Sequence, residues 1–468
     1  MESSSVFGKS RIFQFIFGKI EHFILLERFA SKGKILSLAK WFLSLMLFAC
    51  IFIPRLSLGG GIHSSYRVDI RVEDIILLAL TFLVLVLMSR QGPSKIDSAR
   101  SKTVNRGVIP NTAPKSQFMA VLGTALPELP LVEKAFLGFL IAAQLSIFNG
   151  LFFGAIDKPF LSLLYFVKWF EYFLVFVIAA RLTVSRKESL FFLKAFFLLG
   201  IAIAAYGYWE HFFPLTKDLP PPYYRLFERF PFHGDANHIG GLLVLWLGFF
   251  LGLFLAAENR SQQILWLGSL FFVVPPLIWT YSAKSYLALA GIFLFSFFFR
   301  TGWRKLMLLM LLISLAAFLL PSALWERLAH IRESLGSSDP YVSSWASNGS
   351  MWTKALWNFK QFFLFGSGLG SRHRYFYESQ YVLVLAETGI VGFGCFLWFF
   401  VTLIRQALLG LRQSLPGIEK GYALGWLLGC IGLAIHSTTC VSWTVVKIAI
   451  PFWFLTGFVL ARYKKTSL

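Results

Sequence analysis

The sequence has 468 residues, of which 57% are hydrophobic and only 14% are charged. Soluble domains carry roughly 25% charged residues, so the composition excludes an ordinary soluble fold. Apolar runs of roughly 18 residues or more recur along the chain, and each can cross a bilayer as an α-helix. The sequence therefore predicts an all-α, polytopic membrane protein.

The formal net charge is +21, which in a soluble protein would suggest nucleic acid as a partner. Here many lysines and arginines lie in short loops between apolar runs, so membrane topology explains the charge and we expect no nucleic-acid partner. The cysteines lie in or beside apolar runs without metal-ligand spacing, so we interpret them as small core residues. They are Cys50, Cys395, Cys430 and Cys440.

About twelve spans of near 20 residues fit the hydropathy. Residues 1–40 form a basic segment that we expect to stay in the cytoplasm without signal-peptide cleavage. Spans one to nine lie within residues 41–320, and spans ten to twelve lie within residues 381–468 with a basic tail. In chain order the expected spans are about 41–54, 74–88, 135–153, 161–180, 191–208, 238–256, 265–279, 286–299, 306–320, 381–404, 422–436 and 443–461.

The positive-inside rule orients these spans. With the N-terminus inside, the basic linkers after the even-numbered spans and the tail all lie in the cytoplasm. Three polar connections then face outward, namely residues 214–237, residues 280–285 and the long interval 321–380. We therefore predict a multi-pass membrane protein with both termini in the cytoplasm.

The interval 321–380 is the longest polar stretch, and a loop of this length is usually functional or disordered. Within it, Trp352, Leu356, Phe359 and Phe363 recur at i, i+4, i+7 and i+11, which predicts an amphipathic helix. We expect this large periplasmic loop, with its short helices, to fold back onto the membrane bundle and to build a site there.

The second half of this loop holds candidate residues for binding and catalysis. The glycine-rich run 366–370 allows close backbone approach and offers N–H groups to an anion, although glycine-rich turns are common. Arg372 and Arg374 add positive charge. Glu378 is either a partly desolvated general base or a carboxylate favoured by the start of span ten.

The outward loop before span six is the second candidate segment. Its arginines suit a diphosphate, because the guanidinium donates paired hydrogen bonds, but anchoring at the membrane interface explains them equally well. His233, Asp235 and His238 lie within six residues of one another, yet helix capping is a better explanation than a metal site. The candidate substrate-binding residues here are Arg225, Arg229, His233 and Asn237.

Charged residues at two further places are candidates. Lys284 follows the short turn before span eight and either reaches toward lipid headgroups or binds an anionic ligand. Lys168 and Glu171 lie at i, i+3 within span four, where paired charges are costly and often functional. They form either a structural pair or part of a polar path for a substrate.

Several of these motifs together resemble the bacterial O-antigen ligase and Wzy-type O-antigen polymerase superfamily. In that family a glycine motif in the large loop precedes a His-(Asn/Ser/Gln) pair, nine residues and Gly-x-x-Gly. Here Glu378-Ser379, nine residues and Gly389-Ile-Val-Gly392 match this spacing, with glutamate in place of the histidine. Three further segments are similar to family motifs, namely residues 168–172, 229–238 and 280–283.

The resemblance implies a GT-C-like fold in the bacterial inner membrane. It also implies a metal-independent, inverting glycosyl transfer at the periplasmic face, without a cofactor. The donor would be a glycan on undecaprenyl diphosphate, and the acceptor a glycan or lipid A–core. The bilayer and other polysaccharide-assembly proteins would be further partners. By position, Arg229 would hold the diphosphate, and Glu378 would replace the catalytic histidine as the base.

The chain departs from the family pattern at two arginines. The turn before span eight has Ala283 followed by Lys284, and residues 348–350 lack the arginine expected before the loop helix. Lys284, Arg372 or Arg374 would have to replace them, and lysine would bind phosphate as a point charge. Glutamate in place of histidine favours a polymerase over a ligase, although both remain open.

Two other classes of protein compete with the enzyme. A lipid-linked oligosaccharide transporter, or flippase, would show repeated halves and charges along a central cavity, but the sequence has no visible repeat and one dominant outer loop. An inactive homologue would also account for the missing arginines. The arrangement in space distinguishes these possibilities, because catalytic groups must reach one substrate.

Overall fold

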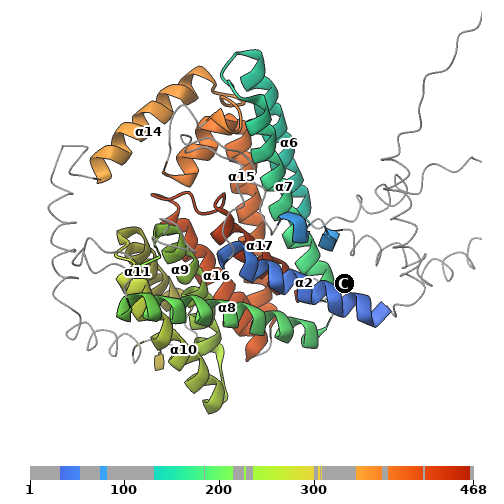
Figure 1. Cartoon of the computed structure of the whole chain (residues 1–468), viewed down its shortest axis with the longest axis vertical. Coiled ribbons are helices and arrows are strands. Elements are labelled where there is room, and N and C mark those ends of the chain that lie inside the picture. Colours follow the sequence, from blue (N-terminus) through green and yellow to red (C-terminus); the bar gives the residue numbers. More distant parts are fainter. Residues whose placement is uncertain are drawn as a thin grey trace, which may run out of the picture.

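The computed structural model describes residues 32–52, 74–77, 79–81, 131–183, 185–213, 226–227, 236–299, 304–305, 307, 344–371, 378–414 and 417–463. Within these ranges all the regular secondary structure is helical (Figure 1). The helices are α2 (Lys32–Phe52), α6 (Leu131–Phe152), α7 (Pro159–Leu182), α8 (Arg186–Phe212), α9 (Ala236–Ala256), α10 (Arg260–Trp279), α11 (Ala283–Ser296) with the 3-10 turn η1 (Phe297–Phe299), α14 (Ser344–Gln361), α15 (Gln380–Gln413), α16 (Ile418–His436) and α17 (Val446–Leu460).

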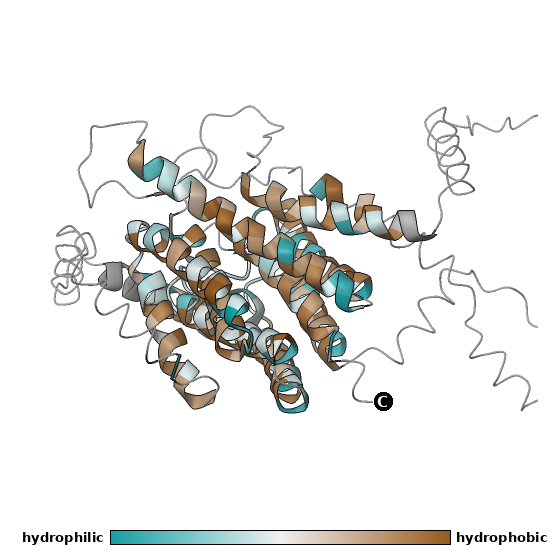
Figure 2. Cartoon of the chain, turned by 90° about the horizontal axis from the view of Figure 1, so that it is seen from below, coloured by the Kyte–Doolittle hydropathy of each residue, from teal (hydrophilic) through white to brown (hydrophobic). Residues whose placement is uncertain are grey.

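Among the described residues, seven helices are long and apolar enough to cross a membrane, namely α6, α7, α8, α9, α10, α15 and α16. Shorter apolar helices cover residues 36–52, 283–299 and 446–460. Figure 2 shows hydrophobic residues along most of each helix and hydrophilic residues gathered near the ends. The all-α, polytopic membrane class is therefore confirmed for the described chain, while expected spans two and nine lie largely beyond it.

Helix α9 is the centre of the bundle, because its membrane-length window is buried throughout. It packs antiparallel against α16 through small residues. A Cβ on Gly248 would lie 2.7 Å from the Gly429 backbone, and a Cβ on Gly252 would lie 2.1 Å from the Gly425 backbone. Glycine at these positions lets the two backbones touch, as is common between membrane helices.

Helices α7 and α17 lie side by side and run in the same direction. Tyr172 donates a hydrogen bond to the Thr444 carbonyl 2.9 Å away, just before α17 begins. Further along both helices, a Cβ on Gly457 would lie 2.7 Å from the Cβ of Ala179. This register places Lys447 at about the depth of Lys168.

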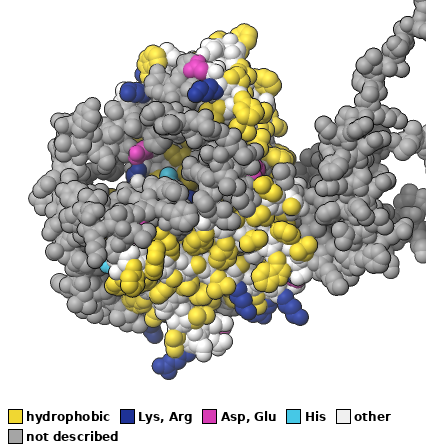
Figure 3. Space-filling view, in the orientation of Figure 1, with side chains coloured by type: hydrophobic (Ala, Val, Ile, Leu, Met, Phe, Trp, Pro, Cys, Tyr) yellow, Lys and Arg dark blue, Asp and Glu magenta, His cyan; other side chains and the backbone are white. Residues whose placement is uncertain are grey.

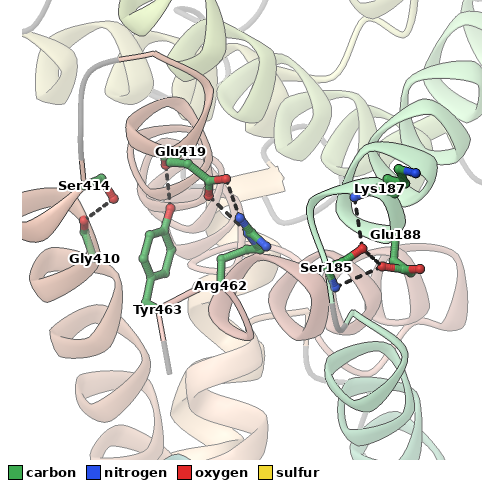
Figure 4. A network of polar contacts seen from close by, with 8 residues as sticks. All are labelled: Ser185, Lys187, Glu188, Gly410, Ser414, Glu419, Arg462 and Tyr463. Atoms are coloured by element: carbon green, nitrogen blue, oxygen red, sulfur yellow. Dashed lines mark hydrogen bonds and ion pairs between the residues drawn. The ribbon is translucent and has the colours of Figure 1, made fainter. Parts of the chain in front are cut away.

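One end of the bundle, opposite α14, is held by polar contacts (Figure 4). Arg462 forms an ion pair of 2.7 Å with Glu419, and Tyr463 donates a hydrogen bond of 2.6 Å to the Glu419 carbonyl. Ser185 and Glu188 cap the start of α8 with a capping box. Dark-blue lysine and arginine side chains lie along the lower edge of the hydrophobic face in Figure 3.

The expected tenth span is two helices joined at Gly389. This residue has φ +66° and ψ −169°, which breaks the helical path inside Gln380–Gln413. The first helix runs from the end of α16, where Gln380 N–H donates to the Ser437 carbonyl, toward the end of α6, where Ser146 donates to the Glu387 carbonyl. The span predicted at 381–404 lies within α15, which is a candidate membrane span, but the sequence did not predict its break at Gly389.

Candidate functional site

Four helix ends converge at the end of the bundle nearest α14: the starts of α9, α11 and α15 and the end of α16. Two adjacent glycines in the first turns of α9 make this possible. A Cβ on Gly240 would lie 2.3 Å from the Ser285 hydroxyl of α11, and one on Gly241 would lie 2.8 Å from the His436 ring of α16. Larger residues at these two positions would separate the helices.

Lys284 and Glu378 meet at this convergence. The Lys284 Nζ atom lies 2.6 Å from Glu378 Oε2, although the two residues are 94 positions apart in the sequence. Their side chains are 18% and 35% exposed, so a ligand can reach both. Figure 3 shows a few basic, acidic and histidine side chains close together on the face turned to the viewer.

The turn before α11 fixes the position of Lys284. Ser282 is the N-cap of α11, and its hydroxyl accepts a hydrogen bond from the Ser285 backbone N–H. Thr280, Ser282 and Ser285 are all at most 1% exposed. Tyr281 has φ +49°, a conformation that is rare for a bulky residue and that often occurs at functional sites. The predicted short turn at 280–285 is thus a buried, tightly bonded one.

The connection between α16 and α17, residues 437–445, forms the other wall of the site. Gln380, which is completely buried, ties the segment carrying Glu378 to this connection. Its backbone N–H donates to the Ser437 carbonyl at 3.0 Å, and its side-chain oxygen accepts from the Trp443 N–H at 3.1 Å. The helix dipole explanation for Glu378 is therefore incomplete, because this carboxylate is held against a lysine.

His436, Ser442 and Cys440 lie at or in the connection between α16 and α17, close to the ion pair of Lys284 and Glu378. His436 is buried and shares a hydrogen bond of 2.8 Å with Ser442. Lys284 acts electrostatically on the His436 ring, and both Lys284 and Glu378 act on the thiol of Cys440. Burial raises the pKa of Cys440 to about 11, so its thiol is neutral at physiological pH.

The structure describes only some of the predicted site residues. Lys284, Glu378 and Asn237 lie at the convergence, and the Asn237 backbone is close enough to act on the His436 ring. Leu226 and Phe227 are held near the same turn, since the Leu226 N–H donates to the Trp279 carbonyl at 3.4 Å. The other predicted residues lie outside the described residues: Arg225, Arg229, His233, Arg372 and Arg374.

The glycine-rich run after α14 binds the protein itself. The backbone N–H groups of Ser367 and Gly368 donate to carbonyls of α15, and the Gly370 N–H donates to the Glu387 carboxylate at 2.9 Å. The suggestion that this run presents its amides to an anion is therefore wrong for these groups. Its glycines are needed for close contact, since a Cβ on Gly366 would lie 2.3 Å from the Glu387 carbonyl oxygen.

A second group of charges lies at a similar level in the bundle. Lys168 pairs with Glu171 at 2.8 Å, as its spacing predicted, and also with Asp74. Lys447, in the first turn of α17, is only 7% exposed. Its neighbour Ile448 lies 2.9 Å from the position of a Cβ on Gly241, so the start of α17 packs against the first turns of α9.

The sequence did not single out His436, Lys447 or Gln380. Each is a polar residue at the edge of an apolar run, which is typical of the boundary of a span. The available signal was their position: Gln380 and Lys447 lie in the first turns of their helices and His436 ends α16. The predicted core role of the cysteines is confirmed for Cys50, Cys430 and Cys440, while Cys395 is half-buried.

One comparison with known proteins covers this site. Residues 268–397 match the family model described as O-antigen ligase. No curated protein matches the chain. The matched range runs from α10 into α15, and it contains both Lys284 and Glu378.

Proposed function

We propose that this chain, in which residues 268–397 match the family model described as O-antigen ligase, transfers a lipid-linked glycan in surface polysaccharide assembly. The proposed donor is a glycan on undecaprenyl diphosphate, and the proposed site of transfer is the periplasmic face of the inner membrane. The observation that carries the proposal is the 2.6 Å pair of Lys284 and Glu378 where four helix ends meet.

The two side chains suit the two halves of such a transfer. Glu378 accepts the proton of the acceptor hydroxyl as that oxygen attacks the anomeric carbon of the donor. The bond from this carbon to the diphosphate oxygen breaks, and the diphosphate leaves with the bonding electrons. Lys284 stabilises the negative charge that develops there, and Arg225, Arg229, Arg372 and Arg374 are proposed to add to this positive field.

The ion pair links donor binding to the base. Without substrate, Lys284 neutralises Glu378 and holds it at the mouth of the site. A diphosphate competes for the same ammonium group, because it carries more negative charge than one carboxylate. Donor binding therefore draws Lys284 away and leaves Glu378 able to accept a proton. Lysine suits this exchange, since its flexible stem carries a single point charge rather than a fixed fork.

The direct test is Glu378→Gln, which keeps the shape of the side chain but removes the base. We expect glycan transfer to fall about 10²–10⁴-fold, which is typical of a lost general base. Surface polysaccharide on gels from a complemented deletion strain measures transfer, and immunoblotting of membranes measures the amount of protein. Full transfer at normal abundance would remove Glu378 from the mechanism.

Glu419→Gln is the matched control, because Glu419 also forms an ion pair but lies at the opposite end of the bundle. We expect this variant to retain transfer. A similar loss in both variants would mean that the loss reflects a general sensitivity to broken ion pairs.

The deletion strain also separates the two activities of the superfamily. A polysaccharide ladder that collapses to a single repeat indicates a polymerase. Long chains that stay on the lipid carrier indicate a ligase. Glutamate at position 378, in place of the family's histidine, favours the polymerase.

A further inference from the structure

Helix α14 buries a different face from the one that its sequence suggests. Ala355 and Asn358 are the buried positions, at 2% and 7% exposure. Ala355 packs with Leu383 and Ala386 of α15, and the Asn358 side chain donates to the Ser367 hydroxyl at 2.8 Å. Of the apolar stripe of the sequence, Leu356 and Phe363 point away from this contact, while Trp352 and Phe359 are partly buried.

Four large apolar side chains of α14 and the turn that follows it are exposed. Leu356 and Trp357 are 48% and 56% exposed, and Phe363 and Leu364 are 51% and 55% exposed. Four large apolar side chains this close together are unfavourable in water, and such patches mark interaction surfaces. We call these four residues the α14 patch.

The α14 patch is continuous with the membrane-facing surface of the bundle. The Phe363 and Leu364 carbonyls accept hydrogen bonds of 2.9 and 3.2 Å from the N–H groups of Ile390 and Val391. Ile390 and Val391 begin the membrane-length half of α15, and they are 40% and 37% exposed. The patch therefore begins where a surface suited to lipid ends.

Helix α6 continues this surface on the other side. Phe153, which follows α6, lies 6.2 Å from the Phe362 ring, measured between ring centroids. Exposed apolar residues extend along α6 in steps of three or four positions, as one lipid-facing stripe would. They are Ile141, Leu145, Phe148 and Phe152.

Basic residues accompany the patch. Lys354 and Lys360 are exposed on the same helix as Leu356 and Trp357. A helix with aromatic and aliphatic residues beside lysines is typical of one that lies in the plane of the membrane interface. The lysine stems can extend so that their ammonium groups reach lipid phosphates.

We propose that α14 is an interfacial helix whose patch lies in the boundary between lipid headgroups and acyl chains. Its partner is the lipid surface on the side of the Lys284–Glu378 site. The clamp between residues 366–370 and α15 fixes α14 at this height, because the two segments share several backbone hydrogen bonds. This inference does not depend on the chemistry of the site.

Spin labels on the full-length protein in lipid nanodiscs test the proposal. Cys395→Ala removes the half-buried cysteine, and Trp357→Cys or Phe363→Cys then carries a nitroxide. Phe148→Cys is the lipid control, and Lys354→Cys is the aqueous control. We expect collision rates with oxygen to exceed those with a water-soluble nickel complex at positions 148, 357 and 363, and the reverse at position 354.

Aqueous collision rates at positions 357 and 363 would overturn the proposal. So would burial that appears only in native membranes and not in nanodiscs of pure lipid, because a protein partner would then cover the patch. The labelled positions are exposed, and a normal elution volume confirms that each variant is folded. The same labels in a Glu378→Gln background should report the same depth, which separates this result from the proposed transfer.

Discussion

At the scale of single residues, the site joins a lysine and a glutamate for which the sequence predicted different roles. Lys284 was a candidate for binding an anion, and Glu378 was a candidate base. The structure joins them at 2.6 Å. A pair with side chains that are partly exposed adds little to stability on average. Its occurrence at the meeting point of four helix ends therefore requires another explanation, which substrate exchange supplies.

Exchanging the two charges separates a structural from a chemical role. Lys284→Glu combined with Glu378→Lys keeps an ion pair at the same place. We expect this double variant to reach the membrane in normal amounts, because opposite charges still meet, yet to have no detectable transfer. Immunoblotting and surface polysaccharide gels measure the two properties. Restored transfer in the double variant would show that the pair only holds the fold.

At the scale of elements, a glycine divides α15 into two helical segments that run in different directions. Gly389 has φ +66°, and a Cβ there would lie 2.4 Å from the Leu364 carbonyl oxygen. The break lets one half cross the bundle end toward Glu378 while the other half runs with α6. The contact between Gly389 and Leu364 also holds the run 366–370 in place. The break in α15 and the clamp on this run therefore depend on each other.

Replacing Gly389 with alanine should destabilise both the break in α15 and the contact with residues 366–370. This backbone conformation is adopted almost only by glycine and costs a residue with a Cβ roughly 1–3 kcal/mol, and overpacking typically adds about 1–3 kcal/mol. We expect Gly389→Ala to lower the thermal unfolding temperature in detergent. Gly394→Ala is the control, because nothing lies within 4 Å of its added Cβ. Equal melting temperatures for the two variants would contradict the role of the break.

At the scale of the whole molecule, α9 and its contact with α16 hold the bundle together. Glycines face each other along both helices, and the first turns of α9 reach the site through Gly240 and Gly241. Packing and site geometry therefore share one interface. A change in the distance between α9 and α16 would move Ser285 and His436, which lie next to these glycines.

Gly425→Ala tests this interface. Its Cβ would lie 2.2 Å from the Phe249 carbonyl oxygen, so the helices must separate. We expect a large loss of folded protein in detergent extracts, measured by size-exclusion chromatography. Gly268→Ala on α10 has no atom within 4 Å and should behave like the unmodified protein. Normal folding of Gly425→Ala would mean that the interface adapts without cost.

Hydropathy predicted the helical membrane class and the approximate positions of the described spans, because a bilayer sets the length of each apolar run. It could not predict the break at Gly389, since Thr388, Ile390 and Val391 continue an apolar pattern and the contact with Leu364 decides the backbone conformation. Nor could it predict which face of α14 is buried, because small residues pack closely there and the larger ones are left outside.

The sequence likewise predicts some features of the candidate site and not others. The spacing of Glu378 to Gly392 and the position of Lys284 could be read from the chain. Their contact could not, because 94 residues separate them and tertiary packing alone joins them. The sequence did not predict a role for His436 or Lys447, because a polar residue at the end of an apolar run forms no periodic pattern.

The short helices beside the site affect the surrounding bilayer. Helix α17 has 15 residues, or about 23 Å, and α11 with η1 covers residues 283–299, or about 26 Å, whereas a hydrocarbon core is about 30 Å thick. Both helices begin at the site. Hydrophobic mismatch of this kind is relieved by local thinning of the membrane. Thinning on the side of the site would let the diphosphate of the proposed donor reach Lys284 from within its own leaflet.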